Sequence, residues 1–333
     1  MTRTEQPLLS ICIPTFNRAR YLKKNIDSIV RQPEFQDGSV EIVVSDNVSE
    51  DATQALCESY AARFANFRYF RNEKNIRDAN FPLALSRGRG VLRRLVNDNR
   101  VLYPDALAYM CRVIRAYEDT KPMLFFADGS HTCKEDTGVL PFAAFLEKAS
   151  FVMTWIGAFS VWDEDCAGIA DDTAYCDLGL WQVDKLCRLV EQKSGVVLQH
   201  KCLSYLHVAG KMDFVPDMFQ VYHDTYFQIL SPYRERGKIS DALWEHLERD
   251  QLYYALTRWA IMWECGGLYS SSGAHSRTEL RDKIFAHFHD KPYFDDYVQY
   301  YEKAKRAIVW KERIKKYVLN ELLDLYSYCH DRP

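Results

Sequence analysis

The sequence lacks the signals that would place it in a membrane-spanning, secreted or redox class. No apolar run reaches the roughly 18 residues of a membrane-spanning helix, and no leader with a small-residue cleavage site is evident. The ten cysteines form no CxxC pair, which argues against a zinc ribbon or a thioredoxin-type site. We therefore expect a reduced, cytoplasmic, globular protein whose cysteines serve as small core side chains.

An excess of charge of either sign is also missing. The 43 Lys and Arg residues nearly balance the 46 Asp and Glu residues, which leaves a net charge of -3. No global field therefore attracts nucleic acid, and we expect no nucleic-acid partner. Apolar side chains are abundant at 47% of the 333 residues, enough for the core of one large domain or two ordinary ones.

Short apolar runs alternate with segments of helical spacing through the first two thirds of the chain. Such runs are typical of buried strands, and they occur at 8–14, 40–44, 67–70, 92–96, 123–126 and 195–198. The alternation predicts βαβ units, and hence an α/β fold with a mostly parallel sheet and helices on both faces. One of the expected helices covers 178–190, and from about residue 213 the pattern becomes almost wholly helical.

Polar residues follow three of the predicted strands. Asn17, Asp46 and Asp98 come directly after the runs at 8–14, 40–44 and 92–96. The carboxyl ends of parallel strands are where such sheets bind ligands. Ser49, with acids at the next two positions, predicts a helix that starts there. No GxGxxG follows the first strand, which argues against a dinucleotide-binding enzyme.

Three stretches resemble a known family. Residues 10–18 (SICIPTFNR) and 41–51 (EIVVSDNVSED) are similar to the opening of family 2 glycosyltransferases. Residues 71–81 (RNEKNIRDANF) are similar to the bacterial branch that includes abequosyltransferase-like enzymes of O-antigen synthesis. The resemblance covers about residues 7–210 and implies a Rossmann-like GT-A domain over 1–212. The nucleotide-sugar half would lie at about 7–105, the acceptor half at about 106–212, and a helical C-terminal region at 213–333.

The resemblance implies a nucleotide site built from the first three strand ends. Asp46 would hydrogen-bond the nucleobase of a UDP-, GDP-, CDP- or dTDP-linked sugar. Pro14, Thr15 and Asn17 would lie against the base and ribose, with Arg71 near the nucleotide. The alternative for Asp46 is a turn-forming residue that ends a strand.

The family's acidic metal motif corresponds here to residues 97–100 (NDNR), where only Asp98 is acidic. Asn99 replaces the carboxylate that usually ligates Mg²⁺ or Mn²⁺, so metal binding by Asp98 and Asn99 should be weakened. Arg100 offers a guanidinium that can stabilise a departing diphosphate instead. Three alternatives stay open: activity with a weakened metal site, metal-independent activity, and a relative that binds sugar nucleotide without turnover.

The acceptor half supplies the remaining candidates. By its distance from Gly195, Asp184 matches the family's general base, which would activate the acceptor hydroxyl for attack with inversion. Asp177 is the second candidate, and the alternative for Asp184 is a solvent-facing helix residue. Trp155 and Gly157 fall in the family's acceptor loop, where the alternative for the tryptophan is core packing.

Residues 303–318 interleave Lys and Arg with apolar side chains. An amphipathic basic helix can lie on an anionic membrane surface, which would place the protein at the inner face of the plasma membrane beside a polyprenyl-linked acceptor. The alternative is a helix packed on the domain with its lysines in water. The sequence thus predicts an inverting hexosyl- or deoxyhexosyltransferase of O-antigen, capsule or lipid-linked oligosaccharide synthesis, or a non-catalytic relative that binds sugar nucleotide or glycan.

Overall fold

The computed structural model describes residues 6–128, 135–198, 203–206, 217–265 and 278–307. The chain divides into two compact units. The first comprises residues 1–209 with 224–247, and the second comprises 210–223 with 248–333. The domain bounds expected from the sequence, 1–212 and 213–333, stay a prediction.

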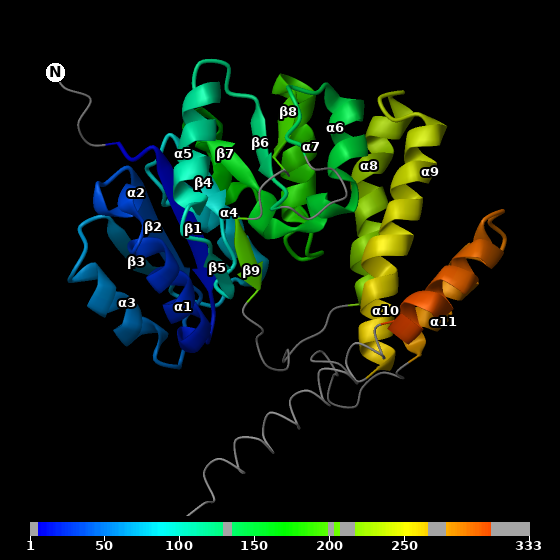
Figure 1. The fold of residues 1–333 in the computed structure, drawn as a ribbon, viewed down its shortest axis with the longest axis horizontal. Coiled ribbons are helices and arrows are strands. Elements are labelled where there is room, and N and C mark those ends of the chain that lie inside the picture. The colour runs from blue at the N-terminus through cyan, green and yellow to red at the C-terminus, as the bar shows by residue number, and fades with distance from the viewer. Residues whose placement is uncertain (1–5, 129–134, 199–202, 207–216, 266–277, 308–333) are drawn as a thin grey trace, which may run out of the picture. The chain divides into compact units, whose positions relative to one another are not determined.

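A five-stranded sheet organises the first unit, in the order β3-β2-β1-β4-β7 (Figure 1). The first four strands in that order run parallel and the last is antiparallel. Their bounds are β1 (Leu9–Thr15), β2 (Val40–Asp46), β3 (Phe67–Arg71), β4 (Leu92–Leu95) and β7 (Ser160–Trp162). Two small sheets pair β5 (Arg100–Leu102) with β9 (Ser204–Leu206), and β6 (Met123–Phe126) with β8 (Gly195–Leu198).

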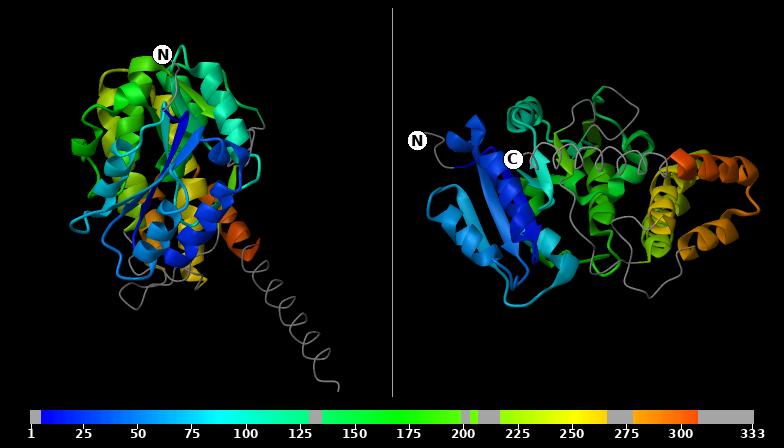
Figure 2. Two further views of the ribbon diagram at one scale, coloured as in Figure 1. Left: turned by 90° about the vertical axis from the view of Figure 1, so that its left-hand side faces the viewer. Right: turned by 60° about the horizontal axis from the view of Figure 1, so that its bottom comes forward.

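Both faces of the sheet are covered, which explains the near-continuous apolar runs. On β1, Ile11 and Ile13 belong to the core cluster that also holds buried residues of α1, α2, α3 and α5. The intervening Cys12 is fully buried as well, and α4 packs against β1, β2 and β4. Figure 2 (left) shows the sheet between layers of helices. The predicted fold class is thereby confirmed.

Two helices of this unit were predicted, and both have shifted limits in the structure. The helix predicted over 178–190 is α7 (Trp181–Lys193). The helix predicted to start at Ser49 is α3, which begins only at Thr53, because Ser49 bonds back to Asp46 while Asp51 accepts the amide of Thr53. The other helices are α1 (Ala19–Val30), α2 (Pro33–Gln36), α4 (Asn80–Ser86), α5 (Ala106–Tyr117), α6 (Phe142–Ala149) and α8 (Tyr226–Glu235).

The second unit is helical and has its own core cluster of apolar and aromatic side chains. Its elements include α10 (Thr257–Glu264), α11 (Glu279–Phe288) and the end of α9 (Asp241–Asp250). Two π-helices, Gln220–Thr225 and Gln251–Leu256, interrupt the regular pattern. Among the described residues, no helix is both long and apolar enough to cross a membrane. Most of the predicted basic helix, from residue 308 on, lies outside the described residues.

Candidate functional site

The parallel register brings the ends of three strands to one edge of the sheet. Thr15 on β1 pairs with Asp46 on β2, and Asp46 pairs with Arg71 on β3. The pairing of β4 with β1 ends at Leu95, so the segment after β4 continues beside the end of β1. Four of the residues predicted to hold a nucleotide, including Asp98, therefore meet at the carboxyl edge.

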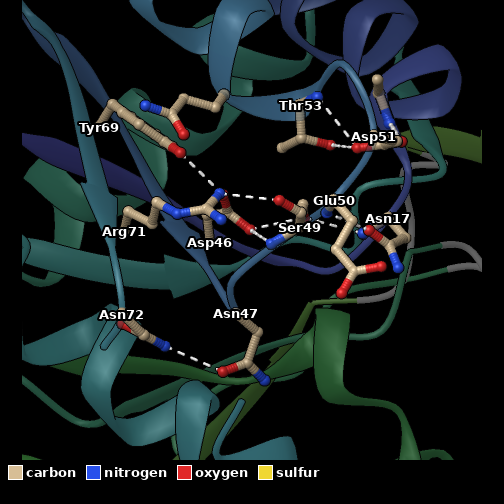
Figure 3. A network of polar contacts seen from close by, with 12 residues as sticks. Asn17, Asp46, Asn47, Ser49, Glu50, Asp51, Thr53, Tyr69, Arg71 and Asn72 are labelled. Carbon is tan, nitrogen blue, oxygen red and sulfur yellow. Dashed lines mark hydrogen bonds and ion pairs between the residues drawn. The ribbon is translucent and has the colours of Figure 1, made fainter. Parts of the chain in front are cut away.

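Asp46 is the centre of a polar network at this edge (Figure 3). Its side chain is fully buried. Oδ1 accepts the Ser49 amide at 2.9 Å and the Ser49 hydroxyl at 2.6 Å. Oδ2 accepts the Tyr69 hydroxyl at 2.7 Å and the Arg71 guanidinium at 3.1 Å. A carboxylate offers about four acceptor positions, so these donors saturate it. A nucleobase reaches Asp46 only if Tyr69 or Arg71 moves.

Asn17 ties the loop after β1 to the loop after β2. Its backbone amide donates to the Ser49 hydroxyl at 2.9 Å, and its side-chain oxygen accepts the Glu50 amide at 2.7 Å. Asn17 and Val48 both have positive φ angles, 53° and 66°. For a β-branched residue such as Val48 this conformation is strained, and strain of this kind gathers at ligand-binding sites. The two loops thus form one rigid rim.

Asn47 extends the rim toward the segment after β3. Its amide donates to the Thr15 carbonyl at 2.9 Å. Its side-chain oxygen accepts from Asn72 and from the Ile76 amide, each at 3.0 Å, and its side-chain nitrogen donates to the Arg77 carbonyl at 3.2 Å. The stretch after β3 that carries the family resemblance is therefore fastened to the ends of β1 and β2.

Residues 97–100 form a tight turn between β4 and β5. The Arg100 amide donates to the Asn97 carbonyl at 3.0 Å. Asn25 of α1 donates to the carbonyls of Asn97 and Arg100, at 3.1 and 2.7 Å. These contacts bind the backbone of the turn, so the turn is held without the use of its own side chains.

Asp98 lies in this turn and is 8% exposed. Its Oδ2 accepts the Thr15 hydroxyl at 2.9 Å, which joins the turn to the end of β1. Burial raises the pKa of Asp98 to about 6, although Arg18 and the Thr15 hydroxyl act in the opposite direction. A carboxyl whose pKa is raised by burial gains from any cation that approaches it, because the cation stabilises the ionised form.

The turn offers oxygen ligands of the kind that a hard divalent cation prefers. Oδ1 of Asn99 is buried and has no hydrogen-bond partner among the described residues, so it is an acceptor without a donor. Together with the Asp98 carboxylate it gives one charged and one neutral oxygen, which fits Mg²⁺ or Mn²⁺ with a single negative charge. The Arg100 guanidinium lies 3.9 Å from Asp128, at the limit of an ion pair.

Three neighbours of the site escaped the sequence reasoning. Arg18 is the cation that lowers the pKa of buried Asp98. Phe16 is 42% exposed at the tip of the loop after β1, and Tyr69 bonds Asp46 directly. Phe16 and Arg18 are part of the SICIPTFNR stretch, so an exposed aromatic and a cation directly after a strand were the available signals.

The first base candidate, Asp184, lies on α7 and is engaged by Arg188. Nε and Nη2 of Arg188 approach Oδ2 of Asp184 at 2.9 and 2.7 Å. Arg188 also bonds both oxygens of Asp172, which in turn pairs with Lys185 at 3.3 Å. Asp184 thus belongs to an ion-pair network in which Arg188 holds its Oδ2.

The second base candidate, Asp177, is exposed. Its charge acts on Asp78, whose pKa is raised to about 6 chiefly by burial and further by Asp177. Asp78 follows Arg77, whose carbonyl accepts from Asn47 in the rim. Asp177 is therefore electrostatically linked to the segment that borders the nucleotide edge.

One of the two acceptor-loop candidates, Gly157, lies beside the turn at 97–100. Gly157 is in a 3₁₀ turn before β7, and its carbonyl accepts from Arg94 of β4 at 3.0 and 3.2 Å. A side chain at Gly157 would begin 3.9 Å from the Asn97 amide oxygen. Trp155, two residues earlier, is partly exposed and packs edge-on against Phe151.

Comparison with known proteins places this site in a described family. Residues 10–120 match the model of "Glycosyl transferase family 2". Abequosyltransferase RfbV of Salmonella typhimurium is 32% identical over 128 residues, 38% of this chain and 37% of that protein. A GalNAc(5)-diNAcBac-PP-undecaprenol beta-1,3-glucosyltransferase of Campylobacter jejuni is 34% identical over 104 residues, 31% of this chain and 33% of that protein. The chain thus matches about a third of the length of these relatives.

Solved structures with a similar course of the chain include S. aureus TarS 1-349 in complex with UDP-GlcNAc. It has 16% identity and a TM-score of 0.49 over 90% of this chain and 92% of that one. The mannosyltransferase PcManGT from Pyrobaculum calidifontis, in complex with GDP-Man and Mn²⁺, has 15% identity and a TM-score of 0.48, covering 91% and 87%.

The matched segment contains the whole edge described above, from the Asp46 network to the turn at 97–100. The resemblance to family 2, and to its abequosyltransferase-like branch, is confirmed for this segment. Residues 10–120, about a third of the chain, are thus similar to glycosyl transferase family 2.

Proposed function

We propose that the protein is a glycosyltransferase that moves a sugar from a nucleotide-sugar donor to a glycan or lipid-linked acceptor. One observation carries the proposal. The segment that matches family 2 gathers Thr15, Asp46, Arg71 and Asp98 at the carboxyl edge of the sheet, on a rim of interlocked loops.

The nucleoside would bind across the ends of β1, β2 and β3. Exposed Phe16 offers a face for stacking, and Pro14 and Thr15 form the floor. Asp46 would accept a hydrogen bond from the base once Tyr69 or Arg71 turns away. Until then those two donors keep the carboxylate satisfied, so the empty site carries no unpaired buried charge.

The diphosphate would lie toward the turn at 97–100, where Arg18 and Arg100 supply positive charge. Asp98 and the free oxygen of Asn99 would hold a divalent cation. A cation there would offset the charge that develops on the departing diphosphate. Because only one carboxylate is present, we propose that the metal binds weakly. Arg18 and Arg100 would then provide most of the positive charge that stabilises the departing diphosphate.

The acceptor hydroxyl needs a base near the anomeric carbon, and we propose an attack that inverts its configuration. Asp177 is exposed and makes no ion pair with a cation among the described residues, whereas Oδ2 of Asp184 is held by Arg188. We therefore assign the proton transfer to Asp177 and keep Asp184 as the alternative. Gly157, beside the turn, and Trp155 would line the acceptor.

The names of the relatives suggest the acceptor class. One transfers abequose, and the other acts on an undecaprenol-diphosphate-linked saccharide. We propose an acceptor of this kind, a bacterial surface glycan under assembly on a polyprenyl carrier. A contact of the basic C-terminal segment with the membrane, at the inner face of the plasma membrane, stays a prediction.

A second function is favoured by the same turn. Its single carboxylate is bonded to Thr15, and Asn99 stands where the family has a second one, which suits a protein that binds sugar nucleotide without turnover. The two proposals differ in one assay. In incubations with UDP-, GDP-, CDP- and dTDP-sugars, an active enzyme should release the nucleoside diphosphate from one of these donors. Transfer of the sugar to water in place of the acceptor is sufficient for this readout. Saturable binding of a sugar nucleotide without release would identify the binder, and absence of binding would contradict both.

A further inference from the structure

The second unit contains a cluster of metal-ligand residues that the proposed reaction does not use. His223 lies in the π-helix Gln220–Thr225, Glu248 in the last turn of α9, and His287 in the last turn of α11. One ligand atom from each residue, a ring nitrogen or a carboxylate oxygen, lies within 4.8 Å of the other two. Three segments distant in sequence therefore bring donor atoms to one point.

Aromatic side chains wall the cluster. The rings of His223 and His287 are 4.2 Å apart between centroids. Phe219 stacks on His223 at 4.8 Å, and Phe288 packs edge-on against His287 at 4.7 Å. His223 and Glu248 are buried at 8% and 7% exposure, while His287 is exposed. The donors thus sit in an apolar wall that opens to solvent on the His287 side, which gives an ion an entry path.

The carboxylate is oriented by partners behind it. Oε2 of Glu248 accepts from Lys291 Nζ at 2.7 Å and from the Tyr293 hydroxyl at 3.0 Å. Outer contacts of this type fix the direction of a ligand and raise the affinity of a metal site. Arg249 in turn lies over the Tyr293 ring at 4.9 Å. Lys291 and Tyr293 therefore fix the direction of the Glu248 carboxylate, which lies near the two histidines.

The helix geometry also marks this place. π-Helical turns are rare and frequently occur at functional sites. One π-helix contains His223, and the other, Gln251–Leu256, begins three residues after Glu248. The two π-helices therefore influence the directions in which the His223 and Glu248 side chains point.

We propose that His223, Glu248 and His287 bind a divalent transition-metal ion, with Zn²⁺ as the best fit. Two imidazoles and a carboxylate are a donor set typical of zinc, with a fourth position left for water. Tetrahedral bonds of about 2.1 Å put ligand atoms about 3.4 Å apart, so small side-chain rotations bring these donors into range. The ion would tie three helical segments together. It differs from the cation at Asp98 and Asn99, whose ligands are oxygens only.

The test uses the untagged full-length protein, stripped with a chelator and then titrated with Zn²⁺ against a chromogenic zinc indicator. We expect one equivalent bound per chain, and a visible absorption spectrum of tetrahedral type with Co²⁺. His287→Ala is the main variant, because His287 is exposed and its loss should leave the fold intact. Its matched control is His289→Ala, an exposed histidine two residues further on.

His287→Ala should weaken Zn²⁺ binding by about 100-fold or more, since even the loss of an outer contact costs 10- to 100-fold. Tyr293→Phe should weaken it by about 10-fold, and His289→Ala should leave it unchanged. Asp98→Asn should still bind one equivalent, which separates this site from any cation at the nucleotide edge. Equal affinity of His287→Ala and the parent protein, or less than a stoichiometric amount of zinc in the parent, would overturn the proposal.

Discussion

The two ends of strand β2 each hold a fully buried carboxylate, Glu41 at the amino end and Asp46 at the carboxyl end. Glu41 accepts from the Ser10 hydroxyl and the Arg89 amide, both at 2.6 Å, and Arg89 and Arg68 add guanidinium contacts at 3.3 and 3.8 Å. Both carboxylates are thus fully supplied with donors. By hydrogen bonding alone the two sites look alike.

The two carboxylates differ in which segments of the chain carry their hydrogen-bond donors. At Asp46 the donors belong to the rim of loops that follows the parallel strands, and the strained Val48 lies between Asp46 and Ser49. At Glu41 the donors are the Ser10 hydroxyl of β1 and the amide of Arg89 in the segment before β4, so Glu41 joins that segment to the sheet. The comparison teaches that saturation of a buried carboxylate does not reveal its role. Position at the carboxyl edge does, because open α/β sheets bind their ligands outside the carboxyl ends of the strands.

The largest expected effect concerns the base, which the account places near the carboxyl edge. Asp177→Asn should lower turnover by about 10²- to 10⁴-fold, the usual contribution of general base catalysis, while donor affinity stays unchanged. Asp184→Asn should cost less than about 10-fold in turnover, because its charge serves the Arg188 network. Steady-state kinetics with the cognate donor measure both. A reversed order of the two variants would return the role to Asp184.

The next effect separates the two ends of β2 directly. Asp46→Asn should weaken nucleotide binding by about 10- to 100-fold, the value of a hydrogen bond to a charged group. Glu41→Gln should lower the free energy of unfolding by about 1–3 kcal/mol, since donors lose their charged partner, and should leave nucleotide affinity unchanged. Denaturant unfolding and calorimetry measure the two quantities. Similar loss of affinity in both variants would remove the distinction between the ends.

The third effect is a gain in stability. Burial raises the pKa of Asp98 to about 6, above the 3.8 of the unfolded chain, so the ionised group destabilises the folded state. The unfolding free energy of the parent should therefore fall as pH rises from about 4 to about 6. At pH 7, Asp98→Asn should be more stable by on the order of 2–3 kcal/mol.

That difference should shrink to zero below about pH 3, where the Asp98 carboxyl is neutral in both the folded and the unfolded chain. The same variant should lose any strengthening of nucleotide binding by Mn²⁺. Urea unfolding at the two pH values provides the measurement. If Asp98→Asn is less stable than the parent at pH 7, the buried carboxylate is structural, like Glu41.

The smallest effect tests whether the saturation of Asp46 must be broken. Tyr69→Phe removes one of the four donors and leaves an acceptor position open to the base. Nucleotide binding should then tighten by about threefold, less than 1 kcal/mol, while stability falls slightly. Isothermal titration resolves a change of this size. Weaker binding would mean that the Tyr69 hydroxyl contacts the nucleotide itself.

The sheet and its edge could be predicted because their signals are local. Apolar runs bounded by Pro14 or by polar residues mark β1, β2 and β4, and parallel pairing then carries Asp46 and Asp98 to the same edge. The start of α3 could not be predicted in this way. Ser49 has the right chemistry for a helix N-cap, but the Asp46 carboxylate competes for its amide and hydroxyl and wins.

The rest of the site depends on contacts distant in sequence. The pairing of Asp98 with Thr15 crosses 83 residues, and the sharing of Arg188 between Asp184 and Asp172 depends on how the segment before α7 folds. His223, Glu248 and His287 give no local signal, because only the packing of three helical segments brings them together. Spacing rules find motifs on one element, whereas these last three residues lie on three different elements.

The most direct test is calorimetric titration of the parent, Asp46→Asn and Glu41→Gln with UDP, GDP, CDP and dTDP, each with Mn²⁺ and with EDTA. The account predicts that one nucleotide binds the parent and Glu41→Gln alike, and binds Asp46→Asn about 10- to 100-fold more weakly. Binding of no nucleotide to the parent, or equal binding to the parent and Asp46→Asn, would contradict a nucleotide site at the carboxyl edge.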